Sequence, residues 1–247
     1  MTRPPRRRHA DVSAGEPRTN RTLAIARLMA CKDLRVELRS RVLTNQVLPF
    51  AGVVMVMFGF ALDDERVLQR VAPGLIWLAT LFSLLIVTQR IFSVETADGA
   101  LDALRVAGVK PSGVFLGKAA ALVVQLIALD IVLLLLALVL YNSEVTGAAQ
   151  GVLLVTTVLA ATCGLAFVGT LYGGLAAGAK GRETLLPLLM LPVVAPVLIG
   201  ATRATEAALN VGGITMQEGW AWVGLLGGFA ALGAIGGVVS FGAMVEE

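Results

Sequence analysis

The segment from Gly113 to Lys118 is the nearest approach to a chemical motif in this sequence of 247 residues. Phosphate-binding loops have the pattern GxxxxGK[ST], in which the lysine contacts phosphate and the hydroxyl binds Mg²⁺. Here three residues rather than four separate the glycines, and Ala119 replaces the hydroxyl residue. The segment therefore predicts no nucleotide hydrolysis, and any ATP hydrolysis must come from another subunit.

Metal, haem and thiol chemistry also lack the residues they need. The single histidine, His9, lies in a polar segment, and the sequence has no CxxC, CxxCH or HExxH motif. Cys31 falls among charged residues and Cys163 among apolar ones, so we expect no disulfide between them. No nucleophile and base, and no pair of carboxylates, come within reach of a common site. We therefore expect no catalytic site, no metal site and no stably bound cofactor.

Asp130 is the one carboxylate deep inside an apolar stretch, followed by Ile131, Val132 and four leucines. A charge at the middle of a bilayer costs about 2.5 to 3.5 kcal/mol on insertion scales, so this side chain should face other helices. Two interpretations stay open. One is an intramembrane polar site on a substrate or proton route, and the other is a protonated acid hydrogen-bonded to a neighbouring helix.

The polar segment between residues 90 and 112 combines carboxylates with apolar side chains. A short helix here would place leucines on one face beside the carboxylates. The residues concerned are Glu95, Asp98, Gly99, Leu101, Asp102 and Leu104. Such a helix is what a membrane subunit needs to dock on a soluble motor domain, and the alternative is an ordinary solvated loop.

Long apolar blocks position these residues and define the class of protein. Hydrophobic residues make up 57% of the chain and charged residues 15%, and the mean hydropathy is +0.82. A helix of about 20 apolar residues crosses the hydrocarbon core of a bilayer. We therefore predict an all-α polytopic membrane protein with six transmembrane helices. The predicted spans are residues 47–62, 71–88, 113–141, 147–178, 185–201 and 220–244.

The chain divides into three parts along its length. Residues 1–19 are rich in arginine and poor in apolar residues, which predicts a disordered basic cytoplasmic tail. Residues 20–45 predict an amphipathic helix in the membrane interface, capped by Asn20, with Asp33 directed away from its apolar face; a soluble helix packed on a partner is the alternative. That face would carry Cys31, Leu34, Leu38 and Val42. Residues 46–247 form the six-helix transmembrane domain.

Small residues and prolines within the spans predict how the helices pack and bend. Pairs of glycines four residues apart suit close packing within the subunit or between two copies. These pairs are Gly169 and Gly173, Gly174 and Gly178, Gly224 and Gly228, and Gly233 and Gly237. Pro187, Pro192 and Pro196 lie in the fifth span, and we predict helix kinks at Pro192 and Pro196. For residues 202–219, a re-entrant or interfacial position stays open.

The positive charges predict the orientation in the membrane. An even number of spans places both termini on one side, and all 20 Lys and Arg residues except Arg66, Arg70 and Arg203 fall on that side. Because positively charged segments stay in the cytoplasm, we predict a multi-pass protein of the cell inner (cytoplasmic) membrane with both termini cytoplasmic. Orientation and membrane lipids account for the basic residues, so no nucleic-acid partner is expected.

Three stretches of the sequence together resemble one known family. The run Arg90-Ile-Phe, followed by Asp98-Gly-Ala-Leu-Asp-Ala-Leu104 and then Lys118, is similar to the cytoplasmic loop of the CcmB family. The stretch from Arg70 to Trp77 is similar to the start of that family's second span. Its fifth span and following loop are similar to Leu191-Pro-Val-Val-Ala-Pro196, Ala201-Thr202 and Glu206-Ala-Ala. The resemblance extends from about residue 22 to the end, whereas the arginine-rich tail and Asp130 depart from it and leave their roles open.

The resemblance implies a permease of ABC-2-type exporter architecture, the membrane subunit of an ABC-type haem exporter for c-type cytochrome biogenesis. It implies a separate CcmA-type ATPase, membrane partners of the CcmC and CcmD type, and a periplasmic haem chaperone of the CcmE type. The segment from Glu95 to Leu104 would then be the ATPase-coupling helix, and two copies of the permease would form a homodimer within the complex.

Haem would be a transported substrate rather than a resident cofactor. In one interpretation haem moves through the permease, and in another the subunit transmits force that releases haem-loaded chaperone from a neighbour. The alternative function is an ABC-2-type permease for lipid, glycan or drug export. Neighbouring genes for haem-handling proteins or for glycosyltransferases would discriminate between these functions.

Overall fold

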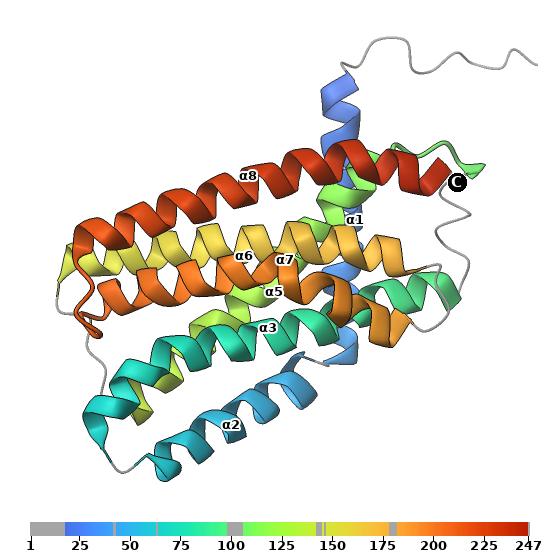
Figure 1. The fold of residues 1–247 in the computed structure, drawn as a ribbon. Coiled ribbons are helices and arrows are strands. Elements are labelled where there is room, and N and C mark those ends of the chain that lie inside the picture. The colour runs from blue at the N-terminus through green and yellow to red at the C-terminus, as the bar shows by residue number, and fades with distance from the viewer. Residues whose placement is uncertain are drawn as a thin grey trace, which may run out of the picture.

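A computed structural model describes residues 18–41, 43–62, 64–97, 106–141, 145, 147–177 and 182–246. The described residues fold into long helices without a strand (Figure 1). The helices are α1 (Arg18–Ser40), the π-helical turn η1 (Leu43–Val47), α2 (Leu48–Ala61), α3 (Glu65–Ala97), α5 (Pro111–Leu140), α6 (Ala148–Ala177), α7 (Arg182–Ala208) and α8 (Met216–Glu246). The prediction of an all-α fold is confirmed for this part of the chain.

Six of these helical segments are long and apolar enough to cross a membrane. They are Leu43–Ala61, Arg66–Phe92, Pro111–Leu140, Ala148–Ala177, Leu185–Ala208 and Met216–Phe241. The prediction of six spans is therefore confirmed. Several are longer than predicted, because polar residues near their ends remain in the helix instead of ending it.

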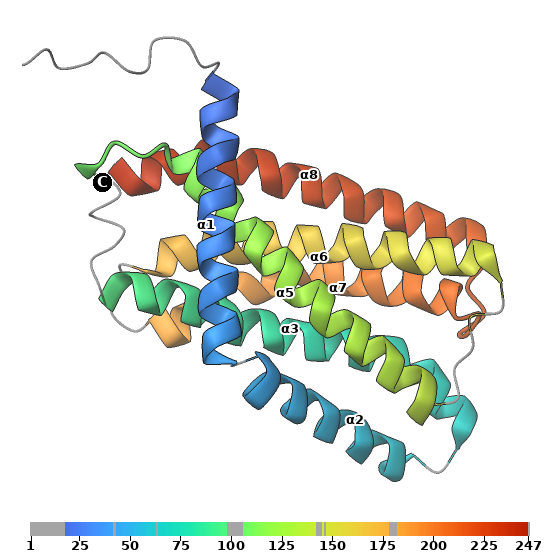
Figure 2. The same ribbon diagram turned by 180° about the vertical axis from the view of Figure 1, so that it is seen from behind.

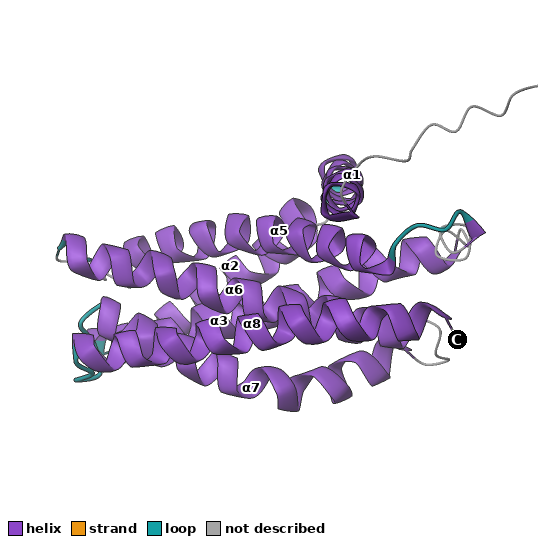
Figure 3. Cartoon of the chain, turned by 90° about the horizontal axis from the view of Figure 1, so that it is seen from above, coloured by secondary structure: helices purple, strands orange, loops and turns teal. Residues whose placement is uncertain are grey.

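The spans run side by side as a bundle (Figures 1 and 3). α6 contacts each of α3, α5, α7 and α8, so it occupies the centre. The largest apolar core includes Trp77, Leu126, Leu165 and Val194, one from each of α3, α5, α6 and α7. α2 lies at the edge of the bundle, where the Tyr141 hydroxyl donates a hydrogen bond of 2.7 Å to the carbonyl of Met55.

α1 crosses the bundle almost at a right angle in both side views (Figures 1 and 2) and is seen end-on from above (Figure 3). If the spans stand upright in a bilayer, α1 therefore lies along the membrane plane. The helix begins at Arg18, so Asn20 is an internal helical residue and not the predicted cap. An N-terminal cap must have a non-helical backbone, which Asn20 lacks.

A tight turn joins α1 to the first span. Arg41 has a left-handed backbone, with φ of 52°, and the Leu43 amide donates a hydrogen bond of 2.7 Å to the carboxylate of Glu37. The left-handed residue ends α1, and the carboxylate satisfies an amide that would otherwise lack a helical partner. The chain can therefore change direction within three residues.

α7 corrects the prediction for residues 202–219. The helix continues through Thr202 to Ala208, and only residues 209–215 form the turn before α8. A re-entrant or interfacial segment is therefore wrong for residues 202–208. Arg203 and Glu206 lowered the local hydropathy, but in the helix they pair with each other at 3.0 Å.

Candidate functional site

α1 rests on a flat surface that two glycines create on α5. A Cβ atom added at Gly117 would lie 2.5 Å from the backbone oxygen of Ala26 and 2.6 Å from the Cβ of Met29. One added at Gly113 would lie 2.8 Å from a methyl carbon of Ile25. Small residues of this kind let two helix backbones approach closely. The glycines that resembled a phosphate-binding loop are therefore helix-packing residues.

The face of α1 that contacts the bundle differs from the predicted one. Ile25, Met29, Asp33 and Glu37 follow one another at steps of four residues and are buried or half-buried. Leu38, in contrast, is 77% exposed, and Cys31 is also exposed. The predicted apolar face is therefore not the one that packs on α5, and its position in the membrane interface stays a prediction. Asp33 does lie away from that face, as predicted, but its partner is Lys118 of α5.

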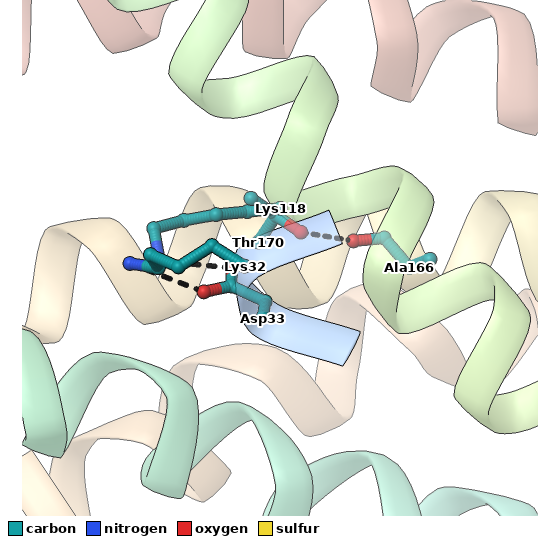
Figure 4. Close-up of polar contacts among 5 residues, drawn as sticks. All are labelled: Lys32, Asp33, Lys118, Ala166 and Thr170. Atoms are coloured by element: carbon teal, nitrogen blue, oxygen red, sulfur yellow. Dashed lines mark hydrogen bonds and ion pairs between the residues drawn. The ribbon is translucent and has the colours of Figure 1, made fainter. Parts of the chain in front are cut away.

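Asp33 and Lys118 form a buried ion pair between α1 and α5 (Figure 4). Lys118 Nζ lies 3.4 Å from Asp33 Oδ2, and the side chains are 1% and 7% exposed. Lys32 approaches the other carboxylate oxygen at 3.2 Å, and Lys118 Nζ also lies 5.0 Å from the centre of the Phe92 ring. Because each buried charge needs its partner, the pair fixes where α1 lies along α5.

α6 passes behind this ion pair in Figure 4. The Thr170 hydroxyl donates a hydrogen bond of 2.8 Å to the carbonyl of Ala166 in its own helix. Thr170 thus satisfies its hydrogen bond within α6.

A small cavity lies beside the ion pair, beneath α1. Its volume is about 40 Å³, and its lining includes Lys32, Asp33, Val36, Glu37, Val87, Arg90, Ile91 and Gln125. Gln125 is 4% exposed, and neither atom of its amide has a hydrogen-bond partner among the described residues. A polar cavity of about 15 Å³ suffices for one water molecule. The cavity therefore fits ordered water bound to Gln125.

Asp130 lies where α3, α5 and α6 meet and is 1% exposed. Its Oδ1 lies 2.6 Å from the Thr80 hydroxyl of α3, and its Oδ2 lies 2.9 Å from the Thr162 hydroxyl of α6. The carboxyl group thus contacts helices on both sides of α5. The prediction that Asp130 faces the bundle interior agrees with this position.

The hydroxyl of Thr80 limits how these hydrogen bonds can be arranged. It lies 2.9 Å from the carbonyl of Ile76 as well as 2.6 Å from Asp130, but it has only one proton to donate. If Thr80 donates to Ile76, the Asp130 carboxyl must be protonated and donate to Thr80. Thr162 then donates to the second oxygen of Asp130. This arrangement satisfies every group around Asp130 with a neutral acid.

α3 and α7 are joined by a further polar contact. The Trp77 indole N–H donates a hydrogen bond of 3.0 Å to the Thr205 hydroxyl, and both residues are buried. Trp77, Lys118 and Glu206 belong to the stretches that resemble the CcmB family, and each makes a polar contact in the structure. The resemblance identified these residues, but it did not indicate which residues they contact.

Most of the predicted ATPase-coupling residues lie outside the described residues. α3 extends to Ala97, so Glu95 is in its last turn and continues a membrane-spanning helix. Asp98, Gly99, Leu101, Asp102 and Leu104 belong to the residues that are not described. Their role stays a prediction.

The predicted helix-kink positions lie within a continuous helix. α7 contains Pro187, Pro192 and Pro196 and bows along its length in Figure 3. A proline lacks the amide proton that would bond to the preceding turn, which favours bending there. A kink at Pro192 and Pro196 stays a prediction.

The glycine pairs of α8 face different surroundings. A Cβ atom at Gly237 would overlap the ring of Phe115, and one at Gly233 would lie 3.2 Å from Phe167. No described atom outside the local helix would lie within 4 Å of a Cβ atom at Gly224 or Gly228. The second pair thus packs within the subunit, while the first faces outward.

The fold and its buried contacts define a multi-pass α-helical membrane protein whose spans are joined by interhelical hydrogen bonds and whose helix α1 is held to α5 by an ion pair. The family model described as CcmB protein matches residues 24–246. The chain therefore belongs to the CcmB family, as the sequence resemblance predicted.

Individual relatives agree with this family. "Heme exporter protein B" of Rhodobacter capsulatus is 31% identical over 174 residues, which cover 70% of this chain and 78% of the relative. The protein of the same name from Haemophilus influenzae is 32% identical over 183 residues, covering 73% and 81%. That of Escherichia coli K12 is 32% identical over 177 residues, covering 71% and 79%.

Proposed function

We propose that this chain is the membrane permease subunit of an ABC-type haem exporter that serves c-type cytochrome biogenesis. The observation that carries the proposal is the CcmB family match over residues 24–246, together with six membrane-length helices. Relatives of similar length are named heme exporter protein B. Haem is the substrate in this proposal, and the chain needs no resident cofactor.

ATP hydrolysis belongs to a separate CcmA-type subunit in this proposal. The glycines and lysine between Gly113 and Lys118 support it, because they pack against α1 and pair with Asp33 instead of forming a phosphate-binding loop. The further partners are CcmC- and CcmD-type membrane proteins and a periplasmic CcmE-type chaperone. Two copies of the permease complete the assembly, and both termini lie in the cytoplasm.

The coupling segment from Glu95 to Leu104 receives the motion of the ATPase. It follows directly from α3, which contacts α5, α6 and α7. A displacement of the segment would therefore move a continuous helix that packs against three other spans. Nucleotide binding and release would shift the bundle between two packed arrangements, as in other domain-closure mechanisms.

Charge reversal tests the docking of the ATPase. Asp98→Lys with Asp102→Lys should prevent co-purification of the ATPase subunit, because the carboxylates of the coupling segment would become cations. The matched control reverses Asp63, between α2 and α3 in the sequence, and Glu144, between α5 and α6. The helix ends on either side of them lie at the end of the bundle opposite the C-terminus (Figure 1). Unchanged recovery of the ATPase with the first variant would refute the coupling assignment.

Reconstitution tests the proposed function as a whole. The chain, its ATPase and the haem-handling membrane proteins are placed in vesicles, and ATP-dependent appearance of haem on the far side is measured. We expect haem to cross. Release of haem-loaded chaperone without crossing would instead support the force-transmitting interpretation. ATP-dependent movement of a lipid or glycan, with neither haem outcome, would favour the alternative class of permease.

A further inference from the structure

A groove between α3 and α7 lies outside every contact assigned above to the permease mechanism. It has a volume of about 350 Å³ and is lined by Gly74, Trp77, Leu78, Leu198, Ile199, Thr202, Arg203 and Glu206. Leu78 is 40% exposed and Ile199 is 56% exposed. Since both belong to membrane-length helices, the groove opens toward the bilayer.

The groove changes from apolar to charged along the axis of α7. Leu198 and Ile199 lie about 15 Å from the end of the helix at Ala208, whereas Arg203 lies about 8 Å from it, at 1.5 Å per residue. The apolar part therefore reaches into the depth of acyl chains, and the charged part lies toward the headgroups. This change from an apolar to a charged lining matches a phospholipid whose long axis is parallel to the spans.

Arg203 supplies donors for a headgroup. Its side chain is 51% exposed, and its Nη1 donates to the Glu206 carboxylate at 3.0 Å. A guanidinium has five N–H groups, and this ion pair orients it while engaging one of its nitrogens. The remaining donors form a planar fork of the kind that binds a phosphate in a bidentate manner.

The charge balance around the groove favours an anion. Glu206 offsets one positive charge, that of Arg203. Arg70 is exposed and lies four residues before Gly74, on the same face of α3 and one turn nearer the headgroups. The charges of the groove's own lining thus balance, and the exposed Arg70 adds a positive charge one turn beyond the groove.

We propose that this groove binds an anionic phospholipid, with the phosphate on Arg203 and one acyl chain along Leu78, Ile199 and the Trp77 ring. The lipid comes from the leaflet at the end of the bundle opposite the C-terminus. The site does not depend on haem export, because it follows from the groove and its charges alone.

Trp77 is a direct reporter of the acyl chain. Trp220→Phe and Trp222→Phe leave it as the only tryptophan in the chain. The full chain is reconstituted in phosphatidylcholine that contains increasing amounts of phosphatidylglycerol with brominated acyl chains. Bromine quenches indole fluorescence at close range, so the quenching curve measures occupancy of the groove. The same titration with brominated phosphatidylcholine gives the headgroup preference.

We expect brominated phosphatidylglycerol to quench Trp77 at lower mole fraction than brominated phosphatidylcholine. Arg203→Gln should reduce this preference about fivefold, since a basic residue contributes about 1 kcal/mol to binding of anionic lipid. Arg66→Gln is the matched control, because Arg66 is an exposed arginine of α3 that does not line the groove. Gly74→Leu should fill the groove and remove the quenching while the helix persists.

Three outcomes would overturn the proposal. The first is equal quenching by both headgroups in the unmodified groove. The second is an equal loss of preference in Arg203→Gln and Arg66→Gln. The third is quenching of Trp77 by protoporphyrin that brominated lipid cannot displace, which would assign the groove to a tetrapyrrole.

Discussion

Asp33 and Lys118 show how single residues hold a helix against a membrane bundle. Both are buried, and each neutralises a charge that would be costly alone. Lys32 offers a comparison on the same helix, because its side chain is 45% exposed although it also approaches Asp33. Charge alone therefore does not decide the contribution of these residues, and burial does.

Breaking the buried pair should destabilise the protein. Asp33→Asn leaves Lys118 as a buried charge without its carboxylate, which costs about 3 to 5 kcal/mol in comparable buried pairs. Asp33→Leu with Lys118→Met replaces both charges with apolar groups and should recover most of the loss. The midpoint of thermal aggregation in detergent, followed by size-exclusion chromatography, measures each variant.

Lys32→Gln is the control for this cycle, since exposed ion pairs contribute about 0 to 1 kcal/mol. We expect its thermal midpoint to stay close to that of the unmodified chain. A double variant that is as unstable as Asp33→Asn would contradict the role of the pair and point to packing at Asp33 instead.

Asp130→Asn should keep both the stability and the transport activity. An amide can accept from Thr162 and donate to Thr80, which reproduces the hydrogen bonds of the neutral acid. Asp130→Ala should lose about 2 kcal/mol or more, because it removes these bonds and leaves a cavity. Thermal midpoints and ATP-dependent transport in vesicles are the two measurements. Loss of transport in a stable Asp130→Asn variant would show that the ionisable group itself is required.

At the scale of helices, the contact between α1 and α5 combines close packing with charge. Gly113 and Gly117 bring the two backbones together. The Asp33–Lys118 pair follows directly after Gly117 on α5 and one turn after Met29 on α1. α5 runs obliquely across α1 (Figure 2), and their contact extends from Thr22 to Asp33 on α1. α1 can then lie in the membrane plane while it stays fixed to the spans.

Gly117→Ala should displace α1 from the bundle. The added methyl group would meet the backbone of Ala26 at 2.5 Å, and a helix backbone cannot give way as a flexible side chain can. Gly228→Ala adds the same methyl group where no described atom lies within 4 Å outside the local helix, and it should leave stability unchanged or slightly improved. Thermal midpoints in detergent measure the effect of each variant. Equal effects of the two glycine variants would argue against the packing role of Gly117.

At the scale of the whole molecule, the distribution of basic residues agrees with the positions of the helix ends in the bundle. The α2–α3 and α7–α8 connections lie at one end of the bundle, and the C-terminus lies at the other (Figure 1). Arg66, Arg70 and Arg203 lie toward the first of these ends, and most of the other basic residues that the structure describes do not. The positive-inside rule then predicts that the C-terminal end faces the cytoplasm.

Cysteine labelling tests this orientation. In a Cys31→Ser and Cys163→Ala background, Glu144→Cys should react with a membrane-impermeant maleimide in intact spheroplasts. In the sequence it lies between α5 and α6, whose adjoining ends lie opposite the C-terminus (Figure 1). Lys180→Cys, which lies between α6 and α7 in the sequence, should react only after lysis. The opposite pattern would invert the proposed topology.

The six spans, the helical class and the family could be predicted from the sequence because their signals are local. Hydropathy over about 20 residues depends on consecutive side chains, and the stretch from Arg70 to Trp77 can be compared without knowing its contacts. The boundaries were less accurate. The extension of α7 to Ala208 was missed because Arg203 and Glu206 count as polar in any window, although they neutralise each other in the folded helix.

The tertiary structure alone decided which polar residues are buried and which glycines are packed. Asp33 and Lys118 are 85 positions apart, and Asp130 finds Thr80 and Thr162 on two other helices. Gly117 and Gly228 both lie in apolar stretches of the sequence. Gly117 nevertheless packs against the backbone of α1, whereas Gly228 faces outward. The reason is physical: hydropathy decides that a segment enters the membrane, but only the packing of distant helices decides what each polar or small residue meets there. The segment from Gly113 to Lys118 illustrates both kinds of information. Its sequence excluded a phosphate-binding loop, and the fold showed that it forms the surface against which α1 packs.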